Sequence, residues 1–315
     1  MIAPSVSRRK AAGAIVTLLL VVAIAATPLF VANPFVYHVG ILVGIEALLA
    51  LSVHLMIRIG QLSLAQAGLM GVGAYVSALV TRDLQAPFLV GFSLAVVTPG
   101  LIAAVIGSVA LRVRGAHFAL LTFALGEAIV LLFVEFVFPF GGNNGLMNIP
   151  SAGIGRWTAA ERPEFYLLVL VVLVVAIVYC RGLLSGRSGT ILQGLLDNEA
   201  LLQSWGINAL SWRLLVFASA AAIAGAAGSL YAHYLGFISP EAFNVTVTVN
   251  ALVMNVVGGL GFLAGPVLGA LLLVPLPELF RSALLYQQLL YGLSLLLLML
   301  FLPRGLAGLL RKGGS

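Results

Sequence analysis

The stretch Phe165-Tyr-Leu-Leu-Val-Leu-Val-Val-Leu-Val-Val-Ala-Ile-Val-Tyr-Cys180 contains no charged residue and is followed directly by Arg181. A helix needs about 20 mostly apolar residues to cross the hydrocarbon core of a bilayer, so this run predicts a transmembrane span. The whole chain of 315 residues has the same character, with 62% hydrophobic and 8% charged residues. Soluble domains contain about 25% charged residues. The sequence therefore predicts an all-α polytopic membrane protein.

Similar apolar runs, bounded by charges, proline or glycine, predict about ten transmembrane helices. They cover residues 11–32, 36–57, 62–81, 87–111, 116–138, 164–181, 213–236, 243–260, 264–281 and 286–302. The first run is interpreted as a retained span, because it is long for the apolar part of a cleaved signal peptide. The glycines of Gly258-Gly-Leu-Gly261 and the pair Gly265-Pro266 separate the eighth span from the ninth. We interpret this region as two short helices that meet at a glycine-rich break, with one long span as the alternative.

The distribution of basic residues predicts the orientation of the chain. With the N-terminus in the cytoplasm, twelve of the 16 Lys and Arg residues fall on the inner side and four on the outer side. Cytoplasmic loops are enriched in these residues, so both termini are predicted to be cytoplasmic. Residues 1–315 then form a single transmembrane domain, with an external loop at 139–163 and a cytoplasmic loop at 182–212.

Polar residues inside the spans are candidates for a translocation path. Three carboxylates fall within predicted spans, Glu46, Glu127 and Glu135. A charge near the bilayer centre costs about 2.5–3.5 kcal/mol on insertion scales, so such residues usually face a bundle interior or a polar path. Glu127 is the closest to mid-span and is predicted to line the path, with a structural glutamate bonded to a neighbouring helix as the alternative. The other candidates lie near the start of a span or near the glycine-rich break, Gln61, Ser63, Gln66, Asn250 and Asn255.

Small residues also predict where helices approach closely. Gly68, Gly71 and Ala74 follow one another at intervals of three residues, so they share one face of a helix. Small residues on a shared face allow the backbones of two membrane helices to come together.

Several classes of function are excluded by what the sequence does not contain. The single cysteine, Cys180, cannot form an internal disulfide or a cysteine metal cluster, and the four histidines are far apart. Neither Lys10 nor Lys312 lies in a G-x-x-x-x-G-K-[ST] loop, so this chain is not a P-loop ATPase by itself. The sequence shows no G-x-S-x-G or H-E-x-x-H motif. We therefore predict a transporter component with no catalytic residues, metal, cofactor or nucleic-acid interface on this chain.

The cytoplasmic loop contains Ser185-Gly-Arg-Ser-Gly-Thr-Ile-Leu-Gln-Gly-Leu-Leu-Asp-Asn-Glu-Ala-Leu-Leu-Gln-Ser-Trp-Gly-Ile207. Helical spacing predicts a first helix from about residue 190 to 196, with Leu192, Leu195 and Leu196 on one face. Asp197 or Asn198 would cap a second helix. That helix carries Leu201, Leu202 and Trp205 and would end at Gly206. An amphipathic helix of this kind fits docking into a groove of another protein, with packing on the chain's own spans as the alternative.

This loop resembles the coupling loop of LivM-type permeases, the membrane subunits of branched-chain amino-acid ABC importers. These subunits belong to the binding-protein-dependent transport permeases. The residues that carry the resemblance are Ser185, Gly189, Leu192-Gln193, Asp197-Asn-Glu199 and Gly206-Ile207. The resemblance continues in order along most of the chain. It includes Gly60-Gln-Leu-Ser-Leu-Ala-Gln-Ala-Gly68, Leu111-Arg-Val-Arg-Gly115, Gly141-Gly-Asn-Asn-Gly-Leu146, Tyr231-Ala-His-Tyr-Leu-Gly-Phe-Ile-Ser-Pro240 and Gly258-Gly-Leu-Gly261.

This resemblance implies a complex in the bacterial inner membrane. Its other components would be a second, related permease subunit, two cytosolic ATPases that bind ATP and Mg²⁺, and an external solute-binding protein. The solute would be a branched-chain or related amino acid moving inward, with urea or short amides as the alternative. The resemblance places Asp197, Asn198, Glu199 and Gly206 in the contact with the ATPase. We expect the apolar side chains of the loop to share that contact, namely Leu195, Leu196, Leu202 and Trp205.

The loop departs from the family pattern Gly-Arg-x-Leu-x-Ala-Ile-Arg-Asp-Asn-Glu at three positions besides the exchange of isoleucine for Leu195. Thr190 and Leu196 stand where relatives often have arginine, and Gly194 stands where they have alanine. The loop therefore lacks two positive charges, and glycine weakens the first helix by roughly 0.8–1 kcal/mol relative to alanine.

A hypothesis of another functional class is that the chain is a self-sufficient secondary transporter in which Glu127 serves as the ion or proton site.

Overall fold

The computed structural model describes residues 33–154, 157–158 and 161–279, together with 289, 292–296 and 300. The predicted span 11–32 lies outside these residues, and so does most of 286–302. The count of ten spans and the cytoplasmic placement of both termini therefore stay predictions. Within the described residues the fold is all-α, apart from four two-residue strands.

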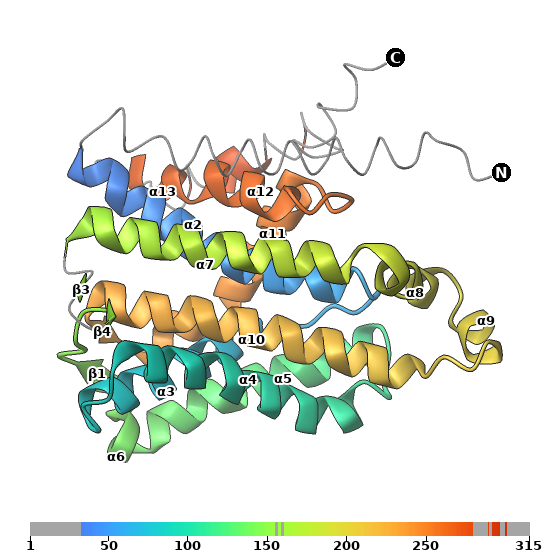
Figure 1. The fold of residues 1–315 in the computed structure, drawn as a ribbon, viewed down its shortest axis with the longest axis horizontal. Coiled ribbons are helices and arrows are strands. Elements are labelled where there is room, and N and C mark those ends of the chain that lie inside the picture. The colour runs from blue at the N-terminus through green and yellow to red at the C-terminus, as the bar shows by residue number, and fades with distance from the viewer. Residues whose placement is uncertain are drawn as a thin grey trace.

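Five helices of the described region are long and apolar enough to cross a membrane. They are α2 (Pro34–Ile57), α4 (Phe88–Ala110), α5 (Ala116–Glu135), α7 (Arg162–Leu183) and α10 (Ala209–Leu235), and they run alongside one another (Figure 1). Each matches a predicted span with small shifts at its ends. The largest shift is at α10, which begins four residues before the predicted 213. It does so because the side chain of Asn208 accepts a hydrogen bond from the Ser211 backbone N–H and caps the helix there.

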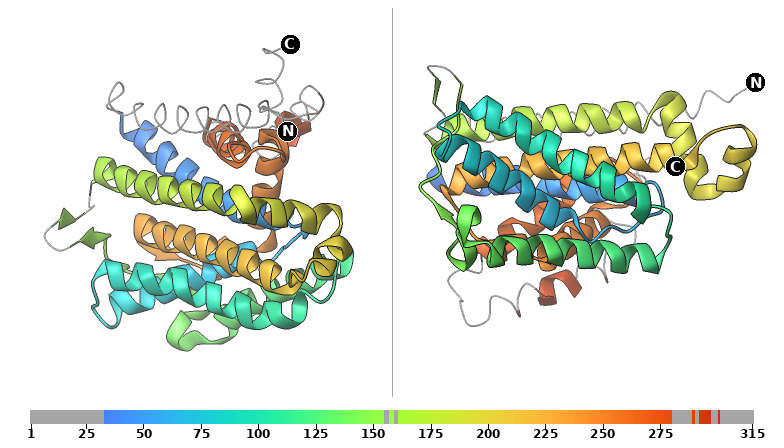
Figure 2. Two further views of the ribbon diagram at one scale, coloured as in Figure 1. Left: turned by 45° about the vertical axis from the view of Figure 1, so that its right-hand side comes forward. Right: turned by 90° about the horizontal axis from the view of Figure 1, so that it is seen from below.

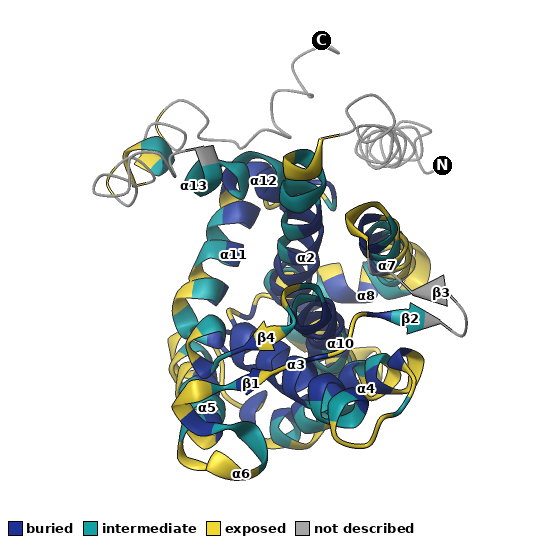
Figure 3. Ribbon diagram, turned by 90° about the vertical axis from the view of Figure 1, so that its left-hand side faces the viewer, coloured by how far each residue is buried: buried dark blue, intermediate teal, exposed yellow. Residues whose placement is uncertain are grey.

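Helix α3 (Gln66–Arg82) lies in the middle of the bundle beside α10 (Figure 3). Thirteen of its 17 residues are buried. The span predicted from residue 62 is helical only from Gln66, and the segment before it is not helical. Gly68 of α3 faces Gly126 of α5, where an added Cβ would lie 3.0 Å from the Gly126 carbonyl oxygen. The close packing predicted for this face is therefore present.

The C-terminal part of the described region contains the predicted break. Helix α11 (Val245–Gly258) is followed by its C-cap Gly259, whose φ of +113° favours glycine, and α12 (Gly265–Leu273) begins after five further residues. Helix α13 (Pro275–Leu279) follows directly. Gly269 of α12 has no room for a Cβ, because the carbonyl oxygen of Met254 in α11 occupies that space. Both α11 and α12 pack on α2, as two short helices rather than one span.

Short elements close the two ends of the bundle. Helices α8 (Gly186–Asp197) and α9 (Glu199–Ser204) lie at one end, in yellow in both views of Figure 2. The opposite end holds α6 (Val137–Phe140), the 3-10 turn Gly142–Asn144 and four strands (Figure 1). Strand β1 (Leu146–Met147) pairs antiparallel with β4 (Phe237–Ile238), and β2 (Gly153–Ile154) pairs with β3 (Trp157–Thr158). A second 3-10 turn, Pro240–Phe243, leads from β4 to α11. The loops 139–163 and 182–212 therefore lie at opposite ends of the fold.

Candidate functional site

The loop between α7 and α10, residues 182–212, folds into α8 and α9, and we call it the helical loop. Helix α8 spans Gly186–Asp197 and is longer than the predicted helix, which began at about residue 190. Asn198 adopts an extended conformation and its side chain accepts a hydrogen bond from the Leu201 backbone N–H at 3.1 Å. Asn198 is therefore the cap of α9, whereas Asp197 accepts hydrogen bonds from Gln193 within α8. Gly206 follows α9 with a φ of +77°, as predicted for a residue that ends a helix.

The apolar side chains of the helical loop divide into a buried and an exposed group. The buried group packs inward and consists of Ile191, Leu192, Leu195 and Leu202. The exposed group, which we call the apolar patch, consists of Leu196, Leu201 and Trp205, with 49%, 51% and 70% of their surface exposed. Leu192, Leu195 and Leu196 share one face of α8 as predicted, but Leu196 lies at its exposed edge. Ile191 occupies the inner face, and because each residue turns a helix by 100°, this rotates Leu196 to the edge.

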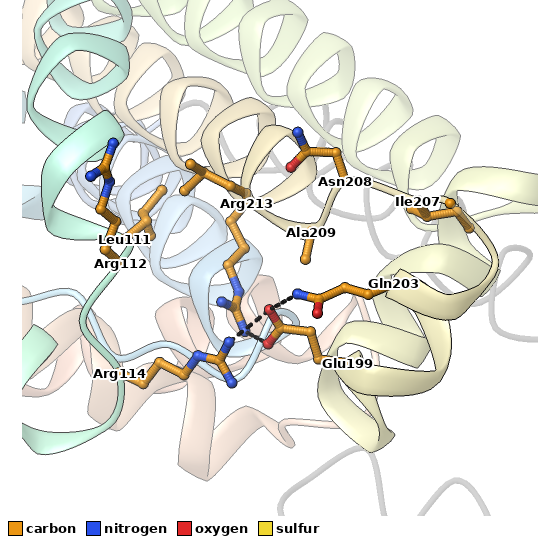
Figure 4. Close-up of a pocket in the computed structure, with 11 residues that line it drawn as sticks. Leu111, Arg112, Arg114, Glu199, Gln203, Ile207, Asn208, Ala209 and Arg213 are labelled. Carbon is orange, nitrogen blue, oxygen red and sulfur yellow. Dashed lines mark hydrogen bonds and ion pairs between the residues drawn. The ribbon is translucent and has the colours of Figure 1, made fainter.

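Glu199, the first residue of α9, joins three parts of the chain. Its Oε1 accepts a hydrogen bond from Arg114 Nη2 at 2.8 Å, and its Oε2 accepts one from Arg213 Nη2 at 2.5 Å. Gln203, one turn further along α9, also donates to Oε1, at 3.2 Å. Figure 4 shows the two guanidinium groups approaching the carboxylate from different elements. Arg114 comes from the α4–α5 turn and Arg213 from the second turn of α10.

The side chains of this ion-pair group differ in exposure. Glu199 and Arg213 keep 11% and 7% of their side-chain surface exposed, whereas Arg114 keeps 60%. They line an open pocket of about 480 Å³ together with Arg112, Gln203, Asn208 and neighbouring backbone (Figure 4). The resemblance placed Glu199 in the contact with the ATPase, and the structure places most of its surface inside this chain.

A second group of polar residues is buried within the bundle, and we call it the polar cluster. It consists of Ser52, His54, Gln61, Ser63, Gln66 and Asn255, none of which is more than 3% exposed. The Asn255 side chain bonds to His54 Nδ1 at 3.0 Å and donates to the backbone carbonyl of Ala50 at 2.8 Å. Ser52 donates to Gln66 Oε1 at 3.4 Å. These contacts join α2, the start of α3 and α11.

The polar cluster has unused hydrogen-bonding capacity. Four buried atoms of the cluster have no hydrogen-bond partner among the described residues, namely His54 Nε2, Gln61 Oε1, Ser63 Oγ and Gln66 Nε2. Buried polar groups are nearly always hydrogen-bonded, and a native exception usually marks a bound water or ion, or a function. Donors and acceptors that remain free inside an apolar bundle can bind water or a polar solute.

The non-helical segment before α3 and the first turn of α3 are each fixed by a threonine from another helix. Thr122 of α5 accepts a hydrogen bond from the Leu64 backbone N–H at 3.1 Å, and Thr248 of α11 accepts one from the Ala67 N–H at 2.9 Å. Helix α3 has no side-chain cap of its own at Ala65. Backbone N–H groups cannot stay unpaired in a bilayer, so irregular segments there need partners from neighbouring helices.

Four of the six residues predicted to line a path are buried, namely Gln61, Ser63, Gln66 and Asn255, and the side chains of Gln66 and Asn255 both bond to α2. Asn250 is only half-buried on α11. Glu127 is partly exposed on α5 and makes no hydrogen bond or ion pair with a described residue. Sequence reasoning missed Ser52, His54, Thr122 and Thr248 as members or supports of the site. The available signal was His54 itself, an ionisable residue within an apolar span.

Comparison with known proteins gives consistent matches. Residues 37–302 match the family model described as branched-chain amino acid transport system / permease component. The high-affinity branched-chain amino acid transport system permease protein LivM of Escherichia coli is 30% identical, over 90% of this chain and 73% of its own length. The protein of that name from Salmonella typhimurium is 29% identical over 93% of this chain and 74% of its own. A probable branched-chain amino acid transport permease protein LivM of Methanocaldococcus jannaschii is 24% identical over 68% of this chain and 67% of its own. No solved structure matches.

Proposed function

The chain belongs to the family of permease components of branched-chain amino acid transport systems, and from this premise we propose that it is the membrane subunit of an ATP-driven importer. It is an integral membrane transport permease, with five described helices suited to crossing a bilayer. In the proposed complex it moves branched-chain or related amino acids inward across the bacterial inner membrane. A second, related permease subunit and an external solute-binding protein complete the membrane part and the delivery of solute.

The observation that carries this proposal is the apolar patch on the helical loop. Leu196, Leu201 and Trp205 lie close together in sequence at one end of the bundle and are about half exposed or more. Adjacent polar positions, Asp197 and Asn198, are exposed as well. Exposed apolar side chains next to exposed polar ones, on a loop outside the long apolar helices, fit a protein–protein contact. The proposed partner is an ATPase, because the sequence of this chain has no phosphate-binding loop and a family of this kind takes its energy from another subunit.

The polar cluster is the proposed place where the solute meets this chain. A zwitterionic amino acid needs both donors and acceptors as it leaves water, and four free polar atoms of the cluster supply both. The cluster adjoins the non-helical segment before α3. In membrane transporters, broken helices and their free backbone groups commonly form the polar site near the bilayer midplane.

The test of ATPase docking uses a pair of single substitutions. Trp205→Ala removes the most exposed member of the apolar patch, and Leu84→Ala removes a side chain that is 74% exposed in the α3–α4 turn. We expect binding of the purified ATPase in detergent to weaken at least tenfold with Trp205→Ala, the range typical of a central aromatic contact. Leu84→Ala should bind as the unchanged chain does. Equal ATPase binding by both variants would overturn the docking role of the patch.

A second experiment addresses energy source and solute. The complete complex in proteoliposomes should take up a branched-chain amino acid when ATP is present on the ATPase side. A panel of unlabelled amino acids, urea and short amides then identifies which compounds compete with this uptake. Competition by urea or acetamide, with none by leucine or valine, would replace the proposed solute class. Uptake by this chain alone under a proton gradient, without ATPase, would instead make it a secondary transporter.

A further inference from the structure

The contacts of Glu199 point to a role for this residue other than touching a partner. Its two carboxylate oxygens bind guanidinium groups from two different elements, at 2.8 and 2.5 Å. Only 11% of the Glu199 side chain is exposed. A partner protein therefore has little of this side chain to contact. We infer that Glu199 is a positioning residue that transmits movement of the helical loop to the membrane helices.

This inference rests on the proposed function, in which an ATPase moves the helical loop. The loop emerges from α7 and re-enters the bundle at α10, and α8 and α9 lie outside the bundle proper (Figure 1). Non-helical residues separate α9 from its neighbours. Asn198 before it is extended, and Gly206 after it has a φ of +77°. Helix α9 is held in place by the buried Leu202, which packs on α8 at Gly194, and by the ion pairs of Glu199, which connect it to α10 and to the α4–α5 turn.

One of the two ion pairs connects α9 to the central helix of the fold. Arg213 belongs to α10, which packs on α2, α3 and α4. The α10 residue Gly228 lies directly on the backbone of α3 at Met70, where a Cβ would have no room. Helix α3 begins with Gln66 of the polar cluster. A displacement of α9 that carries Arg213 with it therefore reaches the helix that bears part of the polar cluster.

The other ion pair connects α9 to the α4–α5 turn. Arg114 precedes Gly115, which has a φ of +61° and opens α5. Helix α5 carries Thr122, the residue that accepts a hydrogen bond from the segment before α3. Glu199 is therefore connected to the start of α3 and the segment before it in two ways, through α10 and through α5. Coupling between distant sites travels through packed contacts of this kind when the elements involved are rigid.

The test compares ATPase binding with the number of solute molecules moved per ATP hydrolysed, using the complete complex in proteoliposomes. Glu199→Gln keeps the shape of the side chain and removes its charge. Arg114→Ala breaks only the ion pair between the exposed Arg114 and Glu199. The ion pair between Glu199 and Arg213 remains, so no buried charge is left unpaired and the variant is expected to fold. The control is Arg112→Ala in the same turn, since Arg112 is exposed and, among the described residues, its side chain donates only to the Ser108 backbone carbonyl.

We expect Glu199→Gln and Arg114→Ala to bind the ATPase within about twofold of the unchanged chain but to move fewer solute molecules per ATP. The loss should be on the order of tenfold for Glu199→Gln, the usual range of coupling between two sites. Arg114→Lys should restore most of the ratio because it keeps the charge. The double variant should be no worse than Glu199→Gln, and Arg112→Ala should be unchanged.

Two results would overturn the inference. The first is weakened ATPase binding by Glu199→Gln, which would make Glu199 a docking residue. The second is a normal transport ratio in both Glu199→Gln and Arg114→Ala. Failure of the proposed function itself would look different, because the unchanged complex would then show no ATP-driven uptake at all.

Discussion

Replacing Thr248 with valine tests whether α11 holds the non-helical segment and the start of α3 in place. Thr248 is fully buried, and its Oγ1 accepts the Ala67 backbone N–H at 2.9 Å. Ala67 lies in the first turn of α3, where no carbonyl of the same helix can accept its N–H. Valine has nearly the same shape as threonine, so the packing is kept and only the hydrogen bond is lost.

The expected magnitude follows from this geometry. A buried N–H left without a partner costs about 1–3 kcal/mol. Hydrogen bonds between membrane helices have been measured at about 0.6 kcal/mol on average and about 1.7 kcal/mol at most. The position combines a fully buried site with a short bond, so we expect Thr248→Val to lower the free energy of unfolding by about 1–2 kcal/mol. This is a factor of roughly 5–30 in the unfolding equilibrium.

The assay is reversible unfolding of the purified chain in mixed detergent micelles, with Thr246→Val as the matched control. Thr246 lies two residues earlier in α11 and is exposed, so the same substitution there removes no interhelical hydrogen bond. Its free energy of unfolding should stay within about 0.5 kcal/mol of the unchanged chain. If the two variants unfold with the same free energy, the contact between Thr248 and Ala67 does not stabilise α3.

Two further outcomes are expected. Gly228→Ala should destabilise the fold by about 1–3 kcal/mol, because its Cβ would collide with the Met70 carbonyl oxygen. The control is Gly182→Ala, where no atom lies within 4 Å of the added Cβ, so this variant should be neutral or stabilising. The two variants are compared by thermal unfolding in detergent. Glu127→Gln should keep complex assembly and ATP-driven uptake within about twofold of the unchanged chain, because Glu127 is partly exposed and bonds to no described residue. Complete loss of uptake in an assembled complex would show that the charge of Glu127 is required.

The long spans could be predicted from the sequence because the signal is local. An apolar run such as 164–181 must cross the bilayer wherever its neighbours lie, and α7 and four other helices appear where such runs do. The broken pair α11–α12 could also be predicted, because glycine and proline in Gly258-Gly-Leu-Gly261 and Gly265-Pro266 interrupt the run. Within the helical loop, the cap and the end of α9 follow from Asn198 and Gly206 by the same local rules.

The pairing of distant residues could not be predicted from the sequence. Nothing near Glu199 in the chain indicates Arg114, which is 85 residues away, or singles out Arg213 among the basic residues. The same holds for Thr122 and Thr248, whose hydroxyl groups bond to backbone N–H groups 58 and 181 residues away. The spacing of Leu192, Leu195 and Leu196 predicts one shared face but does not indicate which edge of that face is buried. In the fold Ile191 joins the buried row, and Leu196 is left at the exposed edge.

Leu196 also shows how the helical loop and the polar cluster are related in space. An added Cβ on Gly60 would lie 3.0 Å from Leu196 Cδ1, so this side chain packs over the backbone at Gly60. The next residue, Gln61, belongs to the polar cluster and has an unpaired Oε1. Leu196 is thus half exposed and half buried against the segment before α3. The helical loop therefore contacts the residue that immediately precedes Gln61 of the polar cluster, in addition to the connections made through Arg114 and Arg213.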